Sequence, residues 1–349
     1  MPTIPQLDQS ARTAAAARQR ILTKPAGSLG RLEAISLDLA AMQGTALPRT
    51  DRKAVIVMAG DHGVTAEGVS AFPSAVTAQM VLNFLSEGAA INVLAGLARA
   101  RLTVVDMGVA ADLPDHPRLM KRKQAFGTCN FAVQPAMTRA QAEAAIAAGM
   151  EILAGEADRG LDLVAIGEMG IGNTTSAAAL ASAFTGLPPA SVTWRGTGVD
   201  DAGLAHKIAV IERALALHRP DPADPVGVLA CLGGYEIAGM VGVTLAAAAR
   251  RIPVVIDGLI SSAAALVAVE LAPSVRDYLI AAHHAQEIGH RAILDRLGLE
   301  PILDLGLRLG EGSGAALAFP IIDAAAATLS GMATFADAGV SEKAPPELA

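Results

Sequence analysis

The stretch VAIGEMGIGNTTSAAALA, from Val164 to Ala181, determines the interpretation of this 349-residue chain. An apolar run ends in a glycine turn, and a helical run begins at Thr174 or Thr175, so the pattern predicts a buried strand, a tight turn and a helix. Gly170 and Gly172 permit backbone angles that a Cβ atom forbids. Free amide groups at the start of such a helix favour an anion, most naturally a phosphate.

Two interpretations of this turn remain open from the stretch itself. Asn173, Thr174 and Thr175 are good helix-capping residues, so the stretch could be a well-capped turn that binds nothing. Glu168 favours a functional site, because a carboxylate at the end of a strand and beside an anion site is an odd structural choice.

Composition excludes several classes of protein. Hydrophobic residues make up 52% of the chain but aromatic residues only 3%, which favours alanine-rich helices packed on a sheet over a β-sandwich. The net charge is −7 and no basic run occurs, so nucleic acid is not an expected partner. The N-terminus lacks a signal-peptide pattern and no uninterrupted apolar run reaches membrane length, so we expect a cytoplasmic protein without a membrane partner. Cys129 and Cys231 stand alone and are expected to be buried thiols in a reducing compartment.

Short apolar runs that end in glycine or polar residues recur along the chain, separated by helical stretches. This rhythm predicts a parallel sheet covered by helices on both faces. Polar residues gather where the runs end, which in an open α/β sheet is the edge that binds ligands. The predicted strands are residues 54–59, 102–107, 161–166, 226–232, 253–256 and 278–282.

Helical patterns account for most of the remaining chain. The first fifty residues show no strand pattern and are expected to form a helical piece apart from the main sheet. Thr138 and Gln141 form a capping box for a helix over 139–157. Pro320 should kink or divide a helix over about 313–332. Further helices are expected over residues 9–22, from about residue 30 onward, and over 74–95.

Several polar clusters follow the predicted strands. Asp61 with His62, and Asp257, could each position a substrate or simply tie down a loop. His283, Glu287 and His290 stand at i, i+4 and i+7 and would share one face of a helix. Their spacing is not that of the HExxH motif, so a hydrogen-bonded polar cluster is favoured over a metal site.

Glu311 is the sharpest candidate for a catalytic group. It lies among three glycines in RLGEGSG, residues 308–314, immediately before an apolar helix. A surface glutamate rarely needs glycine on both sides, whereas small neighbours let a flat ligand approach the backbone. The helix start and the apolar setting would pull its pKa in opposite directions. The alternative is a first-turn residue favoured by the helix dipole.

Together these blocks resemble the nicotinate-nucleotide–dimethylbenzimidazole phosphoribosyltransferase family, which makes the lower-ligand nucleotide of cobalamin. The resemblance spans almost the whole chain in order, and several of its motifs are long and unusual. The matching blocks are KPAGSLGRLE (24–33), GDHGV (60–64), VSAFP (69–73), GEMGIGNTT (167–175), GGYEIAG (233–239), DG (257–258) and RLGEGSGAA (308–316).

The resemblance implies an α/β fold, a Rossmann-like parallel sheet with helices on both faces, plus a small helical domain built from both ends of the chain. It implies a large α/β domain with the active site at residues 50–310 and a small domain at residues 1–49 and 311–349. It also implies a homodimer that acts on small-molecule substrates.

The resemblance further implies a role for each part of the site. Glu311 would be the general base, and Glu168 would lie close to the reacting ribose. The residues implied to hold the donor phosphate are Gly172, Asn173, Thr174, Thr175 and Lys207.

The acceptor pocket is implied by the same resemblance, with Asp61, His62 and Asp257 in support. Some family members carry small or polar residues where Phe72 and Met80 stand, so the preferred ring can differ here. The family block Ser-His-x-Ser-x-Glu-x-Gly-His reads AHHAQEIGH over 282–290, with alanine in place of both serines. The implied pocket residues are Phe72, Gln79, Met80, Leu309 and Gly310.

The implied reaction moves a phosphoribosyl group from nicotinate mononucleotide to 5,6-dimethylbenzimidazole. It gives α-ribazole 5′-phosphate and nicotinate with inversion at C1. The cationic donor ring leaves readily, so no metal, pyrophosphate activation or other cofactor is expected. As one nitrogen of the acceptor bonds, the other loses a proton that Glu311 can accept, while Glu168 can stabilise positive charge that builds on the ribose.

Other classes fit the residues less well. A P-loop kinase needs Gly-Lys-Ser/Thr at the turn, which has no lysine. A dinucleotide dehydrogenase needs GxGxxG and an acidic residue about twenty positions on, and the region around Pro188 supplies none. The remaining alternatives are a non-catalytic nucleotide- or azole-binding protein and a phosphoribosyltransferase that uses a different base.

Overall fold

The computed structural model of the protein describes residues 2–341, and the chain divides into two compact units. The larger unit holds the residues up to Pro5 together with Arg52–Ala318. The smaller unit holds Gln6–Asp51 and the chain from Phe319 onward. The division falls within one helix, α12 (Ser313–Gly331), and it leaves Glu311 in the larger unit.

The sheet of the larger unit has six parallel strands in the order β3-β2-β1-β4-β5-β6. Its central strands β1 and β4 lie side by side, with Met58 opposite Glu168. Every residue of β1 is buried, which explains the continuous apolar pattern. The strands are β1 Lys53–Gly60, β2 Ala100–Gly108, β3 Leu119–Lys121, β4 Leu163–Met169, β5 Val254–Ile256 and β6 Leu279–Ala281.

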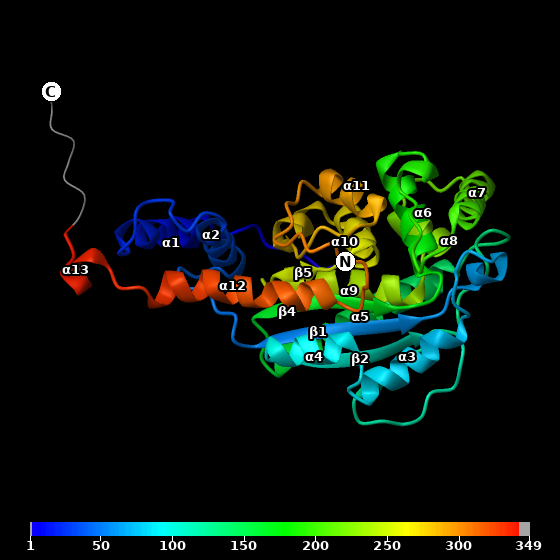
Figure 1. Ribbon diagram of the computed structural model, residues 1–349, viewed down its shortest axis with the longest axis horizontal. Helices are drawn as coiled ribbons and strands as arrows, with labels where there is room; N and C mark the ends of the chain where they lie inside the picture. The colour runs from blue at the N-terminus through cyan, green and yellow to red at the C-terminus, as the bar shows by residue number, and fades with distance from the viewer. Residues whose placement is uncertain (1, 342–349) are drawn as a thin grey trace. The chain divides into compact units, whose positions relative to one another are not determined.

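The direction of the chain across the sheet reverses between β1 and β4. From β1 it moves outward to β2 and β3, and it then returns to the other side of β1 to form β4, β5 and β6. Figure 1 shows β1, β2, β4 and β5 of this sheet. Because such crossovers are right-handed, α3 and α4 cover one face, and α5, α9 and α10 cover the other. The predicted fold class is confirmed. The point where the order reverses, at the carboxyl ends of β1 and β4, is where open α/β sheets bind ligands.

The helices on the sheet pack closely because they are rich in alanine and glycine. A Cβ atom at Gly149 of α5 or at Gly242 of α9 would collide with the backbone of the other helix. The predicted capping box at Thr138 and Gln141 is present at the start of α5. The helices of this unit are α3 Ala75–Leu85, α4 Ala90–Leu97, α5 Arg139–Asp158, α6 Asn173–Thr185, α7 Asp201–His218, α8 Pro225–Leu232, α9 Tyr235–Ala249, α10 Leu259–Leu271 and α11 Ile288–Leu297, followed by the first residues of α12.

The described part of the smaller unit is helical. It contains α1 (Gln9–Ile21), α2 (Arg31–Gln43), the later part of α12, and α13 (Phe335–Ala338). The KPAGSLGRLE block forms the entry to α2. Lys24 Nζ donates to Glu33 Oε1 at 2.7 Å and the Leu29 amide donates to the same oxygen at 3.0 Å. This block therefore fixes a loop within the smaller unit.

Two strand predictions need correction. Residues 226–232 form helix α8, not a strand. The Asp224 side chain accepts from the Gly227 amide and Pro225 stands in the first turn, both typical of a helix start. Strand β3 was not predicted, because it ends in an exposed lysine and lacks the apolar run that marks the equally short β5 and β6.

Three helix predictions also differ from the structure. The helix expected over 74–95 is two helices, since Glu87 adopts φ 62° between α3 and α4. Pro320 lies inside α12 without dividing it. Helix α6 begins at Asn173 after Gly172, whose φ is 97°, and no side chain caps it. The predicted capping by Asn173, Thr174 or Thr175 is therefore wrong.

One further expectation fails. Cys129 is exposed and Cys231 is partly exposed, so neither is a buried thiol.

Two helical stretches, Ala75–Leu97 and Ser313–Gly331, are long and apolar enough to cross a membrane by length and composition, although neither is an uninterrupted apolar run. The first contains the break between α3 and α4, and half of the second is buried. Core helices of soluble proteins pass the same test, so these stretches are weak evidence for a membrane span.

Candidate active site

The start of α6 presents an unused backbone donor at the switch point. The amides of Asn173 and Thr175 donate to the carbonyls of Gly170 and Gly172, at 3.0 Å each. The Thr174 amide has no such partner among residues 2–341. Because this amide stands at a helix N-terminus, it is suited to an anion.

Lys207 completes this anion site from helix α7. Its Nζ atom donates to Thr174 Oγ1 at 2.7 Å, so the structure brings together the turn and the lysine that the sequence analysis paired. Lys207 is only 1% exposed. Burial lowers the pKa of Lys207 to about 8, although Glu287 acts in the opposite direction.

A loop lies over the lysine. A Cβ atom at Gly196 would approach Lys207 Nζ to 3.0 Å and Thr174 Oγ1 to 2.8 Å. Thr197 Oγ1 contacts Ser70 Oγ at 3.1 Å and accepts from the Ala71 amide at 3.0 Å. In this conformation the loop around Gly196 covers the cation.

Two other residues assigned to the phosphate by resemblance differ in their contacts. The Asn173 side-chain amide donates to Glu168 Oε2. The Thr175 side chain is fully buried, and its hydroxyl has no hydrogen-bond partner within the described chain. Their role at the phosphate stays a prediction.

Glu168 is the last residue but one of strand β4 and is 7% exposed. Burial raises the pKa of Glu168 to about 8 against the hydrogen bond from Asn173, and the nearby carboxylates of Asp257, Glu236 and Glu287 add to the rise. Gly310 packs directly on this carboxyl group, because a Cβ atom there would collide with Glu168 Oε1.

Glu311 stands in the same loop, one residue after Gly310. Its backbone is left-handed, with φ 63°, which is uncommon for a residue other than glycine and typical of functional sites. Its carbonyl group packs against Gly167, where a Cβ atom would collide with it. The loop of Glu311 is thus fitted onto the end of β4.

The Glu311 carboxylate is 5% exposed and accepts from the Ile91 amide at 3.3 Å. Ile91 belongs to the first turn of α4, so the partner of Glu311 is the start of α4 rather than that of α12. Burial raises the pKa of Glu311, the Ile91 amide lowers it, and Asp257 raises it again, with a net rise. A carboxylate with a raised pKa is a stronger proton acceptor.

Asp257 supports the Glu311 loop from the end of β5. Its Oδ2 atom accepts from the Gly312 amide at 3.1 Å and its Oδ1 atom from the Ala315 amide at 3.0 Å. The carboxylate therefore caps α12 from another element. His283 Nε2 lies 3.4 Å from Asp257 Oδ1.

Asp61 and His62 tie down loops below the turn. Asp61 Oδ2 accepts from the Ala110 amide at 2.8 Å. His62 Nδ1 lies 2.9 Å from Ser176 Oγ and its Nε2 lies 2.6 Å from Glu236 Oε1. Since both ring nitrogens of this buried histidine contact protein groups, the geometry favours the loop-fixing interpretation over substrate binding.

The predicted acceptor pocket is only partly assembled. Phe72 and Leu309 are 52% and 58% exposed, Gln79 is also exposed, and Met80 is half-buried. Helix α3, which carries Gln79 and Met80, touches the turn through Thr77, whose Oγ1 accepts from the Ile171 amide at 3.1 Å. These side chains do not form an enclosed pocket, and their role stays a prediction.

His283, Glu287 and His290 do not share a helix face, because α11 begins only at Ile288. Among residues 2–341, no group of three or more His, Cys, Asp or Glu side chains is arranged to hold a metal ion. All three are buried, and the His283 and His290 rings lie tilted at 46° to each other with centroids 5.9 Å apart.

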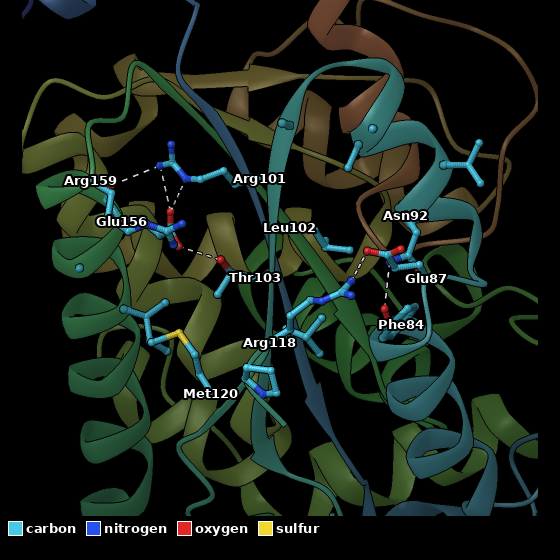
Figure 2. Close-up of a pocket in the computed structure, with 18 residues that line it drawn as sticks. Phe84, Glu87, Asn92, Arg101, Leu102, Thr103, Arg118, Met120, Glu156 and Arg159 are labelled. Carbon is cyan, nitrogen blue, oxygen red and sulfur yellow. Dashed lines mark hydrogen bonds and ion pairs between the residues drawn. The ribbon is translucent and has the colours of Figure 1, made fainter. Parts of the chain in front are cut away.

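A cavity of about 850 Å³ lies elsewhere, between α4, α5 and the strands β2 and β3 (Figure 2). Its charged groups satisfy one another. Glu156 accepts from Arg101 at 2.9 Å and Thr103 at 2.7 Å, and Arg118 pairs with Glu87. None of the predicted site residues lines this cavity, so it is not the candidate active site.

Sequence reasoning missed three parts of this site. The Ile91 amide and the Thr77 hydroxyl are brought in only by tertiary packing, and no local motif marks them. His283 lies in the 282–290 block, whose pattern signalled a polar cluster without showing its partner. The signal that could have pointed to His283 was the run of His and Glu residues after the predicted strand 278–282.

The fold and site define a doubly wound α/β enzyme with a buried lysine at a helix start and two buried carboxyl groups near the switch point. Comparison with known proteins identifies the family. The phosphoribosyltransferase family model matches residues 4–340. The chain belongs to the nicotinate-nucleotide–dimethylbenzimidazole phosphoribosyltransferase family, which confirms the resemblance and the expectation of an enzyme.

Similar proteins cover nearly the whole chain. The enzyme of that name from Roseiflexus sp. (strain RS-1) is 60% identical over 337 residues, covering 97% of this chain and 96% of the relative. That of Geobacter sulfurreducens is 57% identical over 337 residues, 96% of each chain. The crystal structure of CobT from Thermus thermophilus superposes with a TM-score of 0.93 at 50% identity, covering 96% of this chain and 100% of that one.

Proposed function

We propose that this protein transfers the phosphoribosyl group of nicotinate mononucleotide to 5,6-dimethylbenzimidazole. The products are α-ribazole 5′-phosphate and nicotinate, with inversion at C1, in assembly of the cobalamin nucleotide loop. Besides family membership, one observation carries the proposal: the loop of Glu311 is seated on Glu168 at the switch point. The backbone that carries Glu311 thus lies against the Glu168 carboxyl group, close to where a ribose would lie if its phosphate occupied the start of α6.

The donor phosphate would bind at Thr174 and Lys207. The Thr174 amide supplies a dipolar donor, and the Lys207 ammonium group supplies the charge. Gly172 permits the turn, while Asn173 and Thr175 shape it. Since the loop of Gly196 covers Lys207, this loop has to move before the phosphate can reach the ammonium group.

Glu311 would act as the general base. The acceptor nitrogen that bonds to C1 makes the ring cationic, and the proton on its other nitrogen must leave. A buried carboxylate with a raised pKa is matched to this task. The acceptor ring would lie against Gly310, between Leu309 and the side chains of Phe72, Gln79 and Met80.

Glu168 would face the ribose. With a pKa of about 8 it holds its proton at neutral pH in the empty site. A bound pyridinium ring adds a positive charge nearby and would lower that pKa. Glu168 would then ionise in the donor complex and stabilise charge that develops on the sugar.

We also propose a cytoplasmic homodimer, supported by the resemblance. Light scattering of the purified protein measures the dimer mass directly.

The reaction is tested by incubating the protein with nicotinate mononucleotide and a panel of azole and purine bases. Release of nicotinate with formation of the α-ribotide of dimethylbenzimidazole is expected. Turnover only with another base would show a different acceptor, and binding without nicotinate release would show a non-catalytic protein.

A further inference from the structure

The Glu311 loop is held by Asp257, whose buried contact with His283 has not yet been given a function. Glu311 is left-handed, and the glycines on both sides also have positive φ, 89° at Gly310 and 84° at Gly312. Three such residues in a row are not held by local preference, so contacts from other elements must fix the loop. On the C-terminal side of Glu311, these contacts come from the Asp257 carboxylate.

Asp257 uses both carboxylate oxygens on this loop. One accepts from the Gly312 amide, directly after Glu311, and the other from Ala315 in the first turn of α12. This places the start of α12 and therefore the direction in which Glu311 leaves the backbone. The carboxylate can hold two amides only while its plane is fixed.

His283 lies where it can fix that plane. Its Nε2 atom is 3.4 Å from Asp257 Oδ1, and both side chains are 3% exposed. A Cβ atom at Gly314 would collide with the His283 ring, so the ring packs tightly on the first turn of α12. The ring also lies against that of His290, tilted at 46° with centroids 5.9 Å apart.

We infer that Asp257 and His283 form a positioning pair that holds the Glu311 carboxylate in its catalytic orientation. The inference rests on the proposed role of Glu311 as general base. Neither member of the pair needs to touch a substrate. The 282–290 block, interpreted from the sequence as a polar cluster, would then influence catalysis by holding the loop 310–315 in place through Asp257.

The test compares His283→Gln with His283→Asn. Glutamine can place a side-chain amide near the position of Nε2 and donate to Asp257, whereas asparagine is too short. His284, the next residue and only half-buried, provides the control His284→Ala. We measure kcat, the donor KM, and hydrogen–deuterium exchange of the amides in residues 308–318.

For His283→Asn we expect kcat to fall about 10- to 100-fold, with the donor KM within about twofold and faster exchange at Gly312 and Ala315. His283→Gln should recover most of kcat and slow exchange, and His284→Ala should match the wild type. Equal kcat and equal exchange in the Gln and Asn variants would overturn the inference. If the wild type releases no nicotinate, the proposed function fails, while the exchange of residues 308–318 still decides whether the pair holds the loop.

Discussion

Lys207 donates a 2.7 Å hydrogen bond to the hydroxyl of Thr174 at the start of α6, and it does so from a fully buried position. A buried ammonium group that donates to a hydroxyl rather than to a carboxylate is costly. Its pKa, lowered by burial to about 8, reports that cost. The arrangement is explained if the cation is reserved for an incoming anion.

Replacing Lys207 by alanine should therefore weaken donor binding. Loss of one charge-assisted hydrogen bond corresponds to about 1.5–3 kcal/mol, or roughly a 10- to 100-fold rise in the donor KM. Steady-state kinetics with varied nicotinate mononucleotide measure it. His206→Ala, an exposed change on the same helix, is the control, and a donor KM shared by both variants would argue against phosphate contact.

Asn173 gives a contrasting prediction, because its side-chain amide donates a hydrogen bond to Glu168 rather than to the anion. Asn173→Ala should lower kcat by about tenfold, the effect of losing one such hydrogen bond. The donor KM should stay within about threefold. If Asn173→Ala instead raised the donor KM as Lys207→Ala does, Asn173 would have to contact the phosphate.

Glu168 should make the stability of the protein depend on pH. Its folded-state pKa of about 8 lies above the ordinary value of 4.5, so the folded protein retains a proton that the unfolded chain loses. The stabilisation that this proton gives the folded protein is complete below pH 4.5 and is lost as pH rises through 8. Each pKa unit is worth about 1.4 kcal/mol, so the loss is on the order of a few kcal/mol.

Glu168→Gln removes this titration, and urea unfolding between about pH 5 and 9 measures it. The free energy of unfolding of the wild type should fall relative to that of the variant as pH rises. Parallel curves for the two proteins would mean that Glu168 is ionised in the folded protein throughout this range.

Gly310 should not tolerate a side chain. Its φ is 89°, and a Cβ atom would collide with the Glu168 carboxyl group. Gly310→Ala should lower kcat by about tenfold or more, as expected for a displaced catalytic group. Gly186→Ala is the matched control, because that glycine has φ 72° and open space around it. Gly186→Ala should cost about 1 kcal/mol of stability from backbone strain alone, and Gly310→Ala should cost more because its Cβ atom also meets the Glu168 carboxyl group. Similar activity in the two variants would refute a specific effect at Gly310.

The sequence was sufficient to predict the sheet where strands are long and continuously apolar. β1, β2 and β4 were recognised for this reason. The run at 226–232 is also apolar, but a helix of the same length buried on all sides gives the same pattern. Only Asp224 and Pro225, which begin α8, distinguish the two cases.

The site was predictable in part. Glu168 and the glycine turn are adjacent in sequence, so their association follows from a short motif. The pairing of Glu311 with Ile91 crosses 220 residues, and no periodicity or capping rule connects such positions. The same holds for Asp257 and Gly312, which meet only because β5 ends beside α12.

Single-turnover nicotinate release by Glu311→Gln, with both substrates bound, tests the general-base role of Glu311 without interference from binding or product release. Removal of a general base lowers the rate by about 10²–10⁴-fold, and we expect a loss in this range with both substrates bound as in the wild type. The exposed variant Glu212→Gln should react normally. A Glu311→Gln rate close to that of the wild type would contradict the account.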